Sequence, residues 1–164
     1  MKQFLAVAAL NEAVEKHCDT RRDVKIYTEG FKAVQHEAME FSVMCDGELY
    51  QLEKLHEELR QAGFPDPSSL EEAVLYAYLL WGEKAMEHME GAYSFIIRKG
   101  DSLFCAKDPL GLRPIYYLIK DNCIWISCRI QPLLDASDTP AVLNREGLLE
   151  LFAFGPSISE NQTL

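Results

Sequence analysis

The sequence predicts an α+β domain with largely antiparallel sheets and segregated helices. Strand-like apolar runs occupy the first 45 residues and return after residue 90, whereas the stretch between them has helical spacing. Runs of strands followed by runs of helices are typical of this fold class. The length of 164 residues suits one domain with a hydrophobic core.

The first part of the chain is expected to contain four strands. Phe4–Leu10 is a continuous apolar run and predicts a buried strand. Three shorter candidates follow it, namely Val24–Tyr27, Phe31–Val34 and Glu40–Cys45. Glu29-Gly30 predicts a hairpin between the first two of these, and Asp46-Gly47 predicts a turn at the end of the third.

Helices are expected in the middle of the chain. Apolar residues recur at helical spacing over Leu52–Ala62, and Gly63 predicts the end of that helix. A second helix would follow, capped by Ser68 or Ser69 with Glu71 or Glu72 completing a capping box. A short helix is predicted over Glu83–His88.

The pattern then returns to strands and closes with one helix. Ala92–Arg98 and Ser102–Ala106 predict one hairpin, and Ile115–Ile119 and Cys123–Ser127 predict another. The final helix is expected over Asn144–Phe152.

Composition excludes several classes of function. The chain has 16 basic and 26 acidic residues, a net charge of −10, which argues against a nucleic-acid partner and favours a cytoplasmic protein. No apolar run approaches the roughly 20 residues that a membrane span needs, so no membrane partner is expected. The four histidines and five cysteines show no paired ligand spacing, so neither a metal site nor a cofactor is expected in this domain.

Two motifs carry the most specific information. The first is Asp46-Gly47-Glu48-Leu49-Tyr50, and the second is the run from Lys107 to Tyr117, KDPLGLRPIYY. Together and in this order they resemble the N-terminal half of asparagine synthetase, a class II glutamine amidotransferase of the N-terminal-nucleophile hydrolase superfamily. The resemblance covers Cys45 to about Gly155. It implies a four-layer sandwich with two antiparallel β-sheets between helical layers.

The second motif is expected to be structural rather than catalytic. Asp108 and Gly111 predict a turn that continues into Arg113 and Pro114. We expect Arg113 to anchor a carbonyl or a carboxylate near this turn.

The resemblance also implies where catalysis would need particular residues. In such enzymes an N-terminal cysteine attacks glutamine and its own α-amine acts as base, yet Lys2 stands at that position. An Asn side chain and the following Gly N–H form the oxyanion hole, and the matching residues here are Asp46 and Gly47. An aspartate that binds the glutamine α-amine is replaced by Leu70, while Glu48 matches a position near the glutamine pocket. Asp46, Gly47, Glu48 and Leu70 therefore predict a vestigial pocket, with no catalytic residue.

Three functions remain open at this stage. The first is a silent amidotransferase-like domain, residues 1–155, whose residues 156–164 begin a linker to a missing C-terminal synthetase domain. That domain would be its partner and would bind ATP and magnesium, and a homodimer is a further expected partner arrangement. The second is an active glutaminase supplying ammonia for asparagine synthesis, formed by cleavage before Cys18. The third is a non-enzymatic amino-acid-binding or interaction module.

Overall fold

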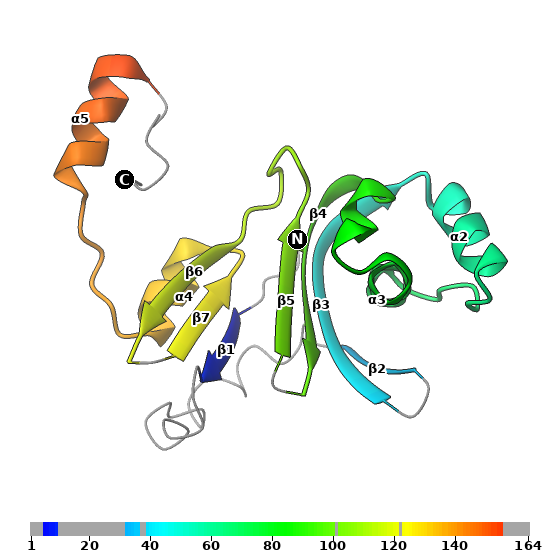
Figure 1. Ribbon diagram of the computed structural model, residues 1–164. Helices are drawn as coiled ribbons and strands as arrows, with labels where there is room; N and C mark the ends of the chain where they lie inside the picture. Colours follow the sequence, from blue (N-terminus) through cyan, green and yellow to red (C-terminus); the bar gives the residue numbers. More distant parts are fainter. Residues whose placement is uncertain (1–4, 10–31, 37–38, 101, 122, 156–164) are drawn as a thin grey trace.

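Seven strands form two antiparallel sheets in the computed structural model, which describes residues 5–9, 32–36, 39–100, 102–121 and 123–155. The three-stranded sheet has the order β1 (Leu5–Ala9), β7 (Cys123–Ser127), β6 (Tyr116–Lys120). The four-stranded sheet has the order β2 (Lys32–His36), β3 (Met39–Tyr50), β4 (Glu90–Lys99), β5 (Ser102–Lys107). Figure 1 shows the two sheets with their labels.

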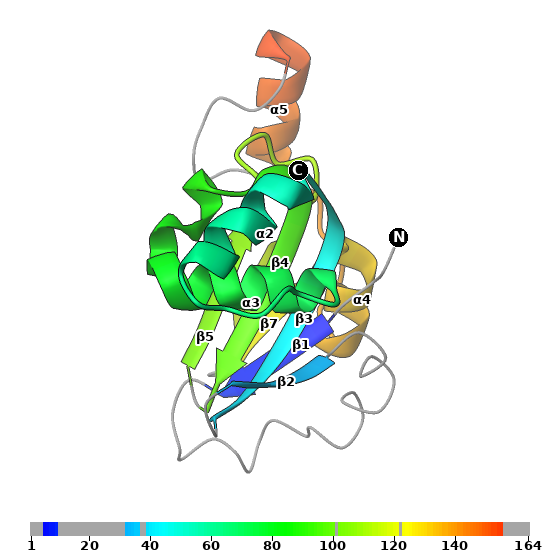
Figure 2. The ribbon, with the colours of Figure 1, turned by 90° about the vertical axis from the view of Figure 1, so that its right-hand side faces the viewer.

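Helices cover the outer faces of both sheets. Figure 2 shows α2 and α3 in front of the four-stranded sheet, and α4 lies on the far side against β6 and β7. The helical segments are α2 (Leu52–Gln61), α3 (Leu70–Trp81), the 3-10 helix η3 (Gly82–Glu87), α4 (Ile130–Ala136) and α5 (Arg145–Phe154). None of these described helices combines the length and the apolar content that crossing a bilayer requires.

Two hydrophobic cores hold the layers together. One core lies between the four-stranded sheet and helices α2 and α3, and includes Leu59, Leu75 and Phe95. The other lies between the two sheets, where Met44 and Ile96 pack with residues of β1 and β7. The layer order is therefore helix, sheet, sheet, helix, which confirms the four-layer sandwich.

The capping signal predicted for the second helix is confirmed. The Ser69 hydroxyl accepts a hydrogen bond from the Glu72 backbone N–H at 3.3 Å and caps α3. The Glu72 carboxylate reaches back to the backbone N–H of Ser68 at 2.8 Å, so the capping box closes one residue earlier than in the standard form. Asn144, expected as the first residue of the final helix, is instead the cap of α5, and its side-chain oxygen accepts a hydrogen bond from the Glu146 N–H at 3.1 Å.

The expected turn at Asp46-Gly47 is wrong. Strand β3 continues through both residues to Tyr50 and stays paired with β4 along this length. Gly47 has φ +122°, so its positive φ bends a strand and does not end one. Strand β2 pairs with β3, and the predicted hairpin between residues 24–27 and 31–34 stays a prediction, because residues 24–27 lie outside the described part of the chain.

Helix α4 is absent from the sequence-based prediction. It contains Pro132 at its third position, where a proline costs little because the first turn leaves its backbone N–H groups without intrahelical partners. A proline inside an apolar run is commonly taken as a helix breaker, so the sequence pattern did not predict this seven-residue helix. The segment over 83–88 is helical as expected, although it is a 3-10 helix.

Candidate functional site

Asp46 lies on the face of the four-stranded sheet that is turned toward the other sheet. It shares this face with Met44, which belongs to the core between the sheets. Asp46 is only 3% exposed, and it pairs across the β3–β4 ladder with Ser94. Asp46, one of the predicted site residues, is thus a buried acid between the two sheets of the sandwich.

Gly47 is required by how closely β3 and β4 approach. A Cβ built on this residue would lie 2.0 Å from the carbonyl oxygen of Ala92 and 2.8 Å from the Cα of Tyr93. Real Cβ atoms do not approach other atoms so closely, and the contacting atoms are backbone that cannot rotate away. Only glycine fits at this point of the strand.

Glu48 and Leu70 differ from Asp46 in their surroundings. Glu48 is exposed near the end of β3, two residues beyond the buried Asp46. Leu70 begins α3 and packs against the core between the helices and the sheet, on the face opposite Asp46. The four predicted pocket residues are therefore divided between two faces of one sheet.

The loop after β5 is a turn that hydrogen bonds to Asp108 hold in place. This residue is 1% exposed, and its carboxylate accepts hydrogen bonds at 3.0 Å from the backbone N–H groups of Leu112 and Arg113. Its own N–H donates to the Tyr93 carbonyl at 2.8 Å, and its carbonyl accepts from Gly111 at 2.9 Å. Gly111 has φ +67°, which glycine adopts without strain.

Electrostatics of this turn favour the ionised acid. Burial by itself raises the pKa of Asp108, but several backbone hydrogen bonds, including those to Leu112 and Arg113, outweigh burial and hold the pKa below its ordinary value. The structural role predicted for Asp108, Gly111, Arg113 and Pro114 fits this geometry. The contact of Arg113 is made by its backbone N–H, and no guanidinium bond to another described residue is found.

The comparisons with known proteins agree with this arrangement. Residues 18–164 match the family described as glutamine amidotransferase domain. The chain belongs to this family. Asparagine synthetase [glutamine-hydrolyzing] 3 of Bacillus subtilis is 33% identical over 120 residues, which are 71% of this chain and 20% of that protein. Asparagine synthetase [glutamine-hydrolyzing] 1 of the same organism is 27% identical over 128 residues, 76% of this chain and 20% of that protein.

A solved structure supports the fold. Glutamine phosphoribosylpyrophosphate amidotransferase from B. subtilis superposes with a TM-score of 0.56 at 19% identity, covering 68% of this chain and 26% of that one. This likeness shows an N-terminal-nucleophile hydrolase-like fold. The amidotransferase domain spans about a fifth of the length of the curated relatives it matches.

Ser94 is a residue of this amidotransferase domain to which the sequence pattern assigns no role. It is fully buried beside Asp46, and its hydroxyl is a buried polar group without a hydrogen-bond partner in the described structure. The ladder continues from Ser94 to Lys107 of β5, so three polar residues form one row across three strands. The available signal was a polar residue inside the apolar run of β4, AYSFII.

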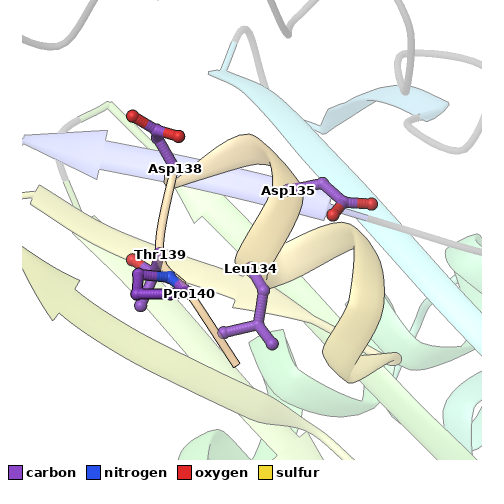
Figure 3. A pocket seen from close by; sticks show the side chains of 5 residues that line it. All are labelled: Leu134, Asp135, Asp138, Thr139 and Pro140. Carbon is purple, nitrogen blue, oxygen red and sulfur yellow. The ribbon is translucent and has the colours of Figure 1, made fainter. Parts of the chain in front are cut away.

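A depression of about 340 Å³ beside α4 does not form a second site among the described residues. Its lining residues are Leu134, Asp135, Asp138, Thr139 and Pro140. Figure 3 shows that the two aspartates point in different directions and do not converge on one position. Within the described ranges, no group of three or more His, Cys, Asp or Glu side chains is arranged to hold a metal. Lys2 and Cys18 lie outside these ranges.

Proposed function

We propose that this chain is the amidotransferase-type part of an asparagine synthetase-like, ATP-dependent amide ligase, and that this part does not hydrolyse glutamine. Residues 1–155 would be the domain and 156–164 the start of a linker to a synthetase domain. That partner domain would bind ATP and magnesium. The size of the relatives supports this, since the chain spans only 20% of two asparagine synthetases that it matches. A cytoplasmic location suits the net charge of −10.

The observation that carries the proposal is the buried carboxylate of Asp46. The resemblance assigns this position to an oxyanion-hole donor, and an ionised carboxylate only accepts hydrogen bonds. With 3% of Asp46 exposed, solvent would screen little of its repulsion toward a developing oxyanion. Loss of one such donor costs about 100- to 1,000-fold in rate, and a negative charge in its place would cost more.

Substrate capture supports the same proposal. The resemblance places an aspartate for the glutamine α-amine at the position of Leu70. Leu70 has no charge, and it packs in the core between α3 and the sheet. An uncharged side chain cannot form the ion pair that would hold the α-amine.

A role as scaffold and interface is supported by the C-terminal helix. Leu149 and Phe152 are 70% and 80% exposed, and three residues apart on a helix they lie on one face. Val142 and Leu143, just before the helix, are exposed as well. Figure 1 shows α5 standing away from both sheets. Apolar surface of this kind marks interaction sites, and we propose that the synthetase domain covers it.

Glutamate release from glutamine, measured on the purified chain beside a glutamine-hydrolysing relative, tests the proposal. We expect no release above the buffer background. The intact mass of the same sample is measured in parallel. Release from a chain whose mass corresponds to cleavage before Cys18 would replace the proposal with the processed glutaminase, and release from any other form would overturn the argument from Asp46.

A further inference from the structure

Strand β6 forms one edge of the three-stranded sheet, and no described strand pairs with its outer side (Figure 1). A two-residue connection joins Lys120 to Cys123, and Asp121 within it has φ +51°, as a type I′ hairpin turn requires. The closing pair of such a hairpin exchanges hydrogen bonds, and bonded and non-bonded pairs alternate along the ladder. The backbone N–H and C=O groups of Tyr117 and Ile119 therefore point away from β7, toward the free edge.

The side chains of these two residues are apolar and exposed. Tyr117 is 68% exposed and Ile119 is 58% exposed. Their partners across the β6–β7 ladder, Ile126 and Ile124, pack into the core between the sheets, and directly paired residues share a face. Tyr117 and Ile119 thus lie on the face turned toward the four-stranded sheet, yet that sheet leaves them uncovered.

The edge also lacks the usual protection against pairing with another strand. Edge strands are commonly blocked by a bulge, a proline or a charged side chain. Strand β6 pairs with β7 in unbroken register, and its only charged residue is Lys120 at its end. The Lys120 amine donates to the carbonyl oxygens of Ser137 and Asp138 at 2.7 and 2.8 Å, which holds it beside the end of α4. The rest of the strand carries no charge.

We propose that β6 pairs antiparallel with β6 of a second copy of the chain, so that two three-stranded sheets join across a twofold axis. Leu118 is the middle residue of the strand, and a register centred on it pairs all five residues. Tyr117 of each copy then lies opposite Ile119 of the other. Both residues direct their backbone groups to the edge, so each of these two pairs exchanges both of its N–H···O=C hydrogen bonds.

A second copy is the partner that fits this edge, because β6 is complementary to itself. Aromatic residues opposite β-branched residues are favourable cross-strand pairs, and the symmetry forms the Tyr117–Ile119 pair twice. A twofold contact is closed, so the pairing ends at a dimer. Two five-residue strands bury less than the about 1,200–2,000 Å² of a stable interface, so the dimer is weak and reversible. This inference goes beyond the proposed function, since it involves neither Asp46 nor the exposed face of α5.

Sedimentation equilibrium of the purified chain, at concentrations from about 1 µM to about 1 mM, tests the proposal. We expect the average mass to rise with concentration from that of one chain toward twice that value. Hydrogen exchange followed by NMR should show that the amides of Tyr117 and Ile119 become protected as the dimer forms. A monomer at every concentration would overturn the proposal, as would a dimer that leaves these two amides unprotected. Both measurements use the unaltered chain, so poor folding of a variant leaves them decisive.

Charge substitutions test the register. Tyr117→Glu or Ile119→Lys alone places a charge opposite an apolar side chain, so each should raise the dimer Kd about tenfold or more. The double variant Tyr117→Glu/Ile119→Lys places an acid opposite a base in both pairs and should recover most of the lost affinity. Leu149→Lys, at a similarly exposed residue of α5, is the matched control and should leave Kd unchanged. A double variant that recovers no affinity would refute this register, and loss of the dimer in Leu149→Lys would overturn the proposal by moving the contact to α5.

Discussion

Replacing Gly47 by alanine should be far more damaging than the same change at Gly63, where a Cβ would meet no other atom. The new Cβ would lie 2.0 Å from the Ala92 carbonyl oxygen and 2.8 Å from the Tyr93 Cα. Both atoms belong to the backbone of β4, so no side-chain rotation relieves the overlap. The two strands have to separate at this point.

The cost can be worked out from two contributions. Holding a non-glycine residue at φ +122° costs about 1–3 kcal/mol. Separating β3 from β4 around Gly47 would weaken neighbouring ladder hydrogen bonds, each with a net value of about 1 kcal/mol. Together these predict a loss of about 3–5 kcal/mol, a large part of the roughly 5–15 kcal/mol that usually stabilises a domain.

Gly63→Ala is the matched control. Gly63 also has a positive φ, +90°, but nothing lies within 4 Å of the position that its Cβ would take. It should therefore lose only the conformational contribution, about 1–2 kcal/mol. Urea unfolding followed by circular dichroism gives both free energies of unfolding. If Gly47→Ala lost no more stability than Gly63→Ala, the close approach of β3 and β4 would be refuted.

Three further outcomes are expected. Asp108→Asn should lower the free energy of unfolding by about 2–4 kcal/mol at pH 7, because an amide oxygen replaces a carboxylate that accepts two backbone N–H bonds. The pKa of Asp108 is lowered in the folded state, so its contribution to stability is present above the ordinary carboxyl pKa of about 4 and is lost as pH falls through the folded value. In urea titrations, the difference in unfolding free energy between Asp108→Asn and the wild type should therefore disappear in acid. Burial raises the pKa of the Cys105 thiol to about 11, so iodoacetamide at pH 8 should alkylate this residue much more slowly in the native protein than in urea. Peptide mass spectrometry gives both rates, and equal rates would contradict the burial of the thiol. His88→Ala should lower Tm by about 2–4 °C, because the imidazole stacks on Trp81 at 3.9 Å and lies 3.0 Å from a Glu58 oxygen; an unchanged melt would show that these contacts add no stability.

Local signals allowed most elements to be predicted. The helix cap at Ser69 depends on residues within one turn, and the hairpin β4–β5 depends on a short polar connection. The four-layer arrangement came from the resemblance, because spacing along the chain does not say how two sheets stack. Periodicity could predict only that strands and helices would segregate.

The site was harder to predict because its geometry is set by tertiary contacts. An Asp-Gly pair has the same local signal in a turn and in a bent strand, and the close passage of β4 decides between them at Gly47. Motif order placed Asp46 and Leu70 in one pocket, yet the alternation of β3 turns Asp46 toward the other sheet, and Leu70 packs on the helix side. The position of Ser94 opposite Asp46 depends on the strand register, which no single strand reveals.

The pairing of β1 with β7 has a consequence for how the domain folds. Leu5 pairs with Ser127, more than 100 residues later, whereas the β4–β5 and β6–β7 hairpins close within a few residues. During synthesis, β1 would leave the ribosome long before β7, the strand with which it pairs. Until then one edge of β7 would have no neighbour, so the three-stranded sheet would be completed late. Non-local pairing of this kind slows folding and leaves the nascent chain exposed to aggregation until the sheet is complete.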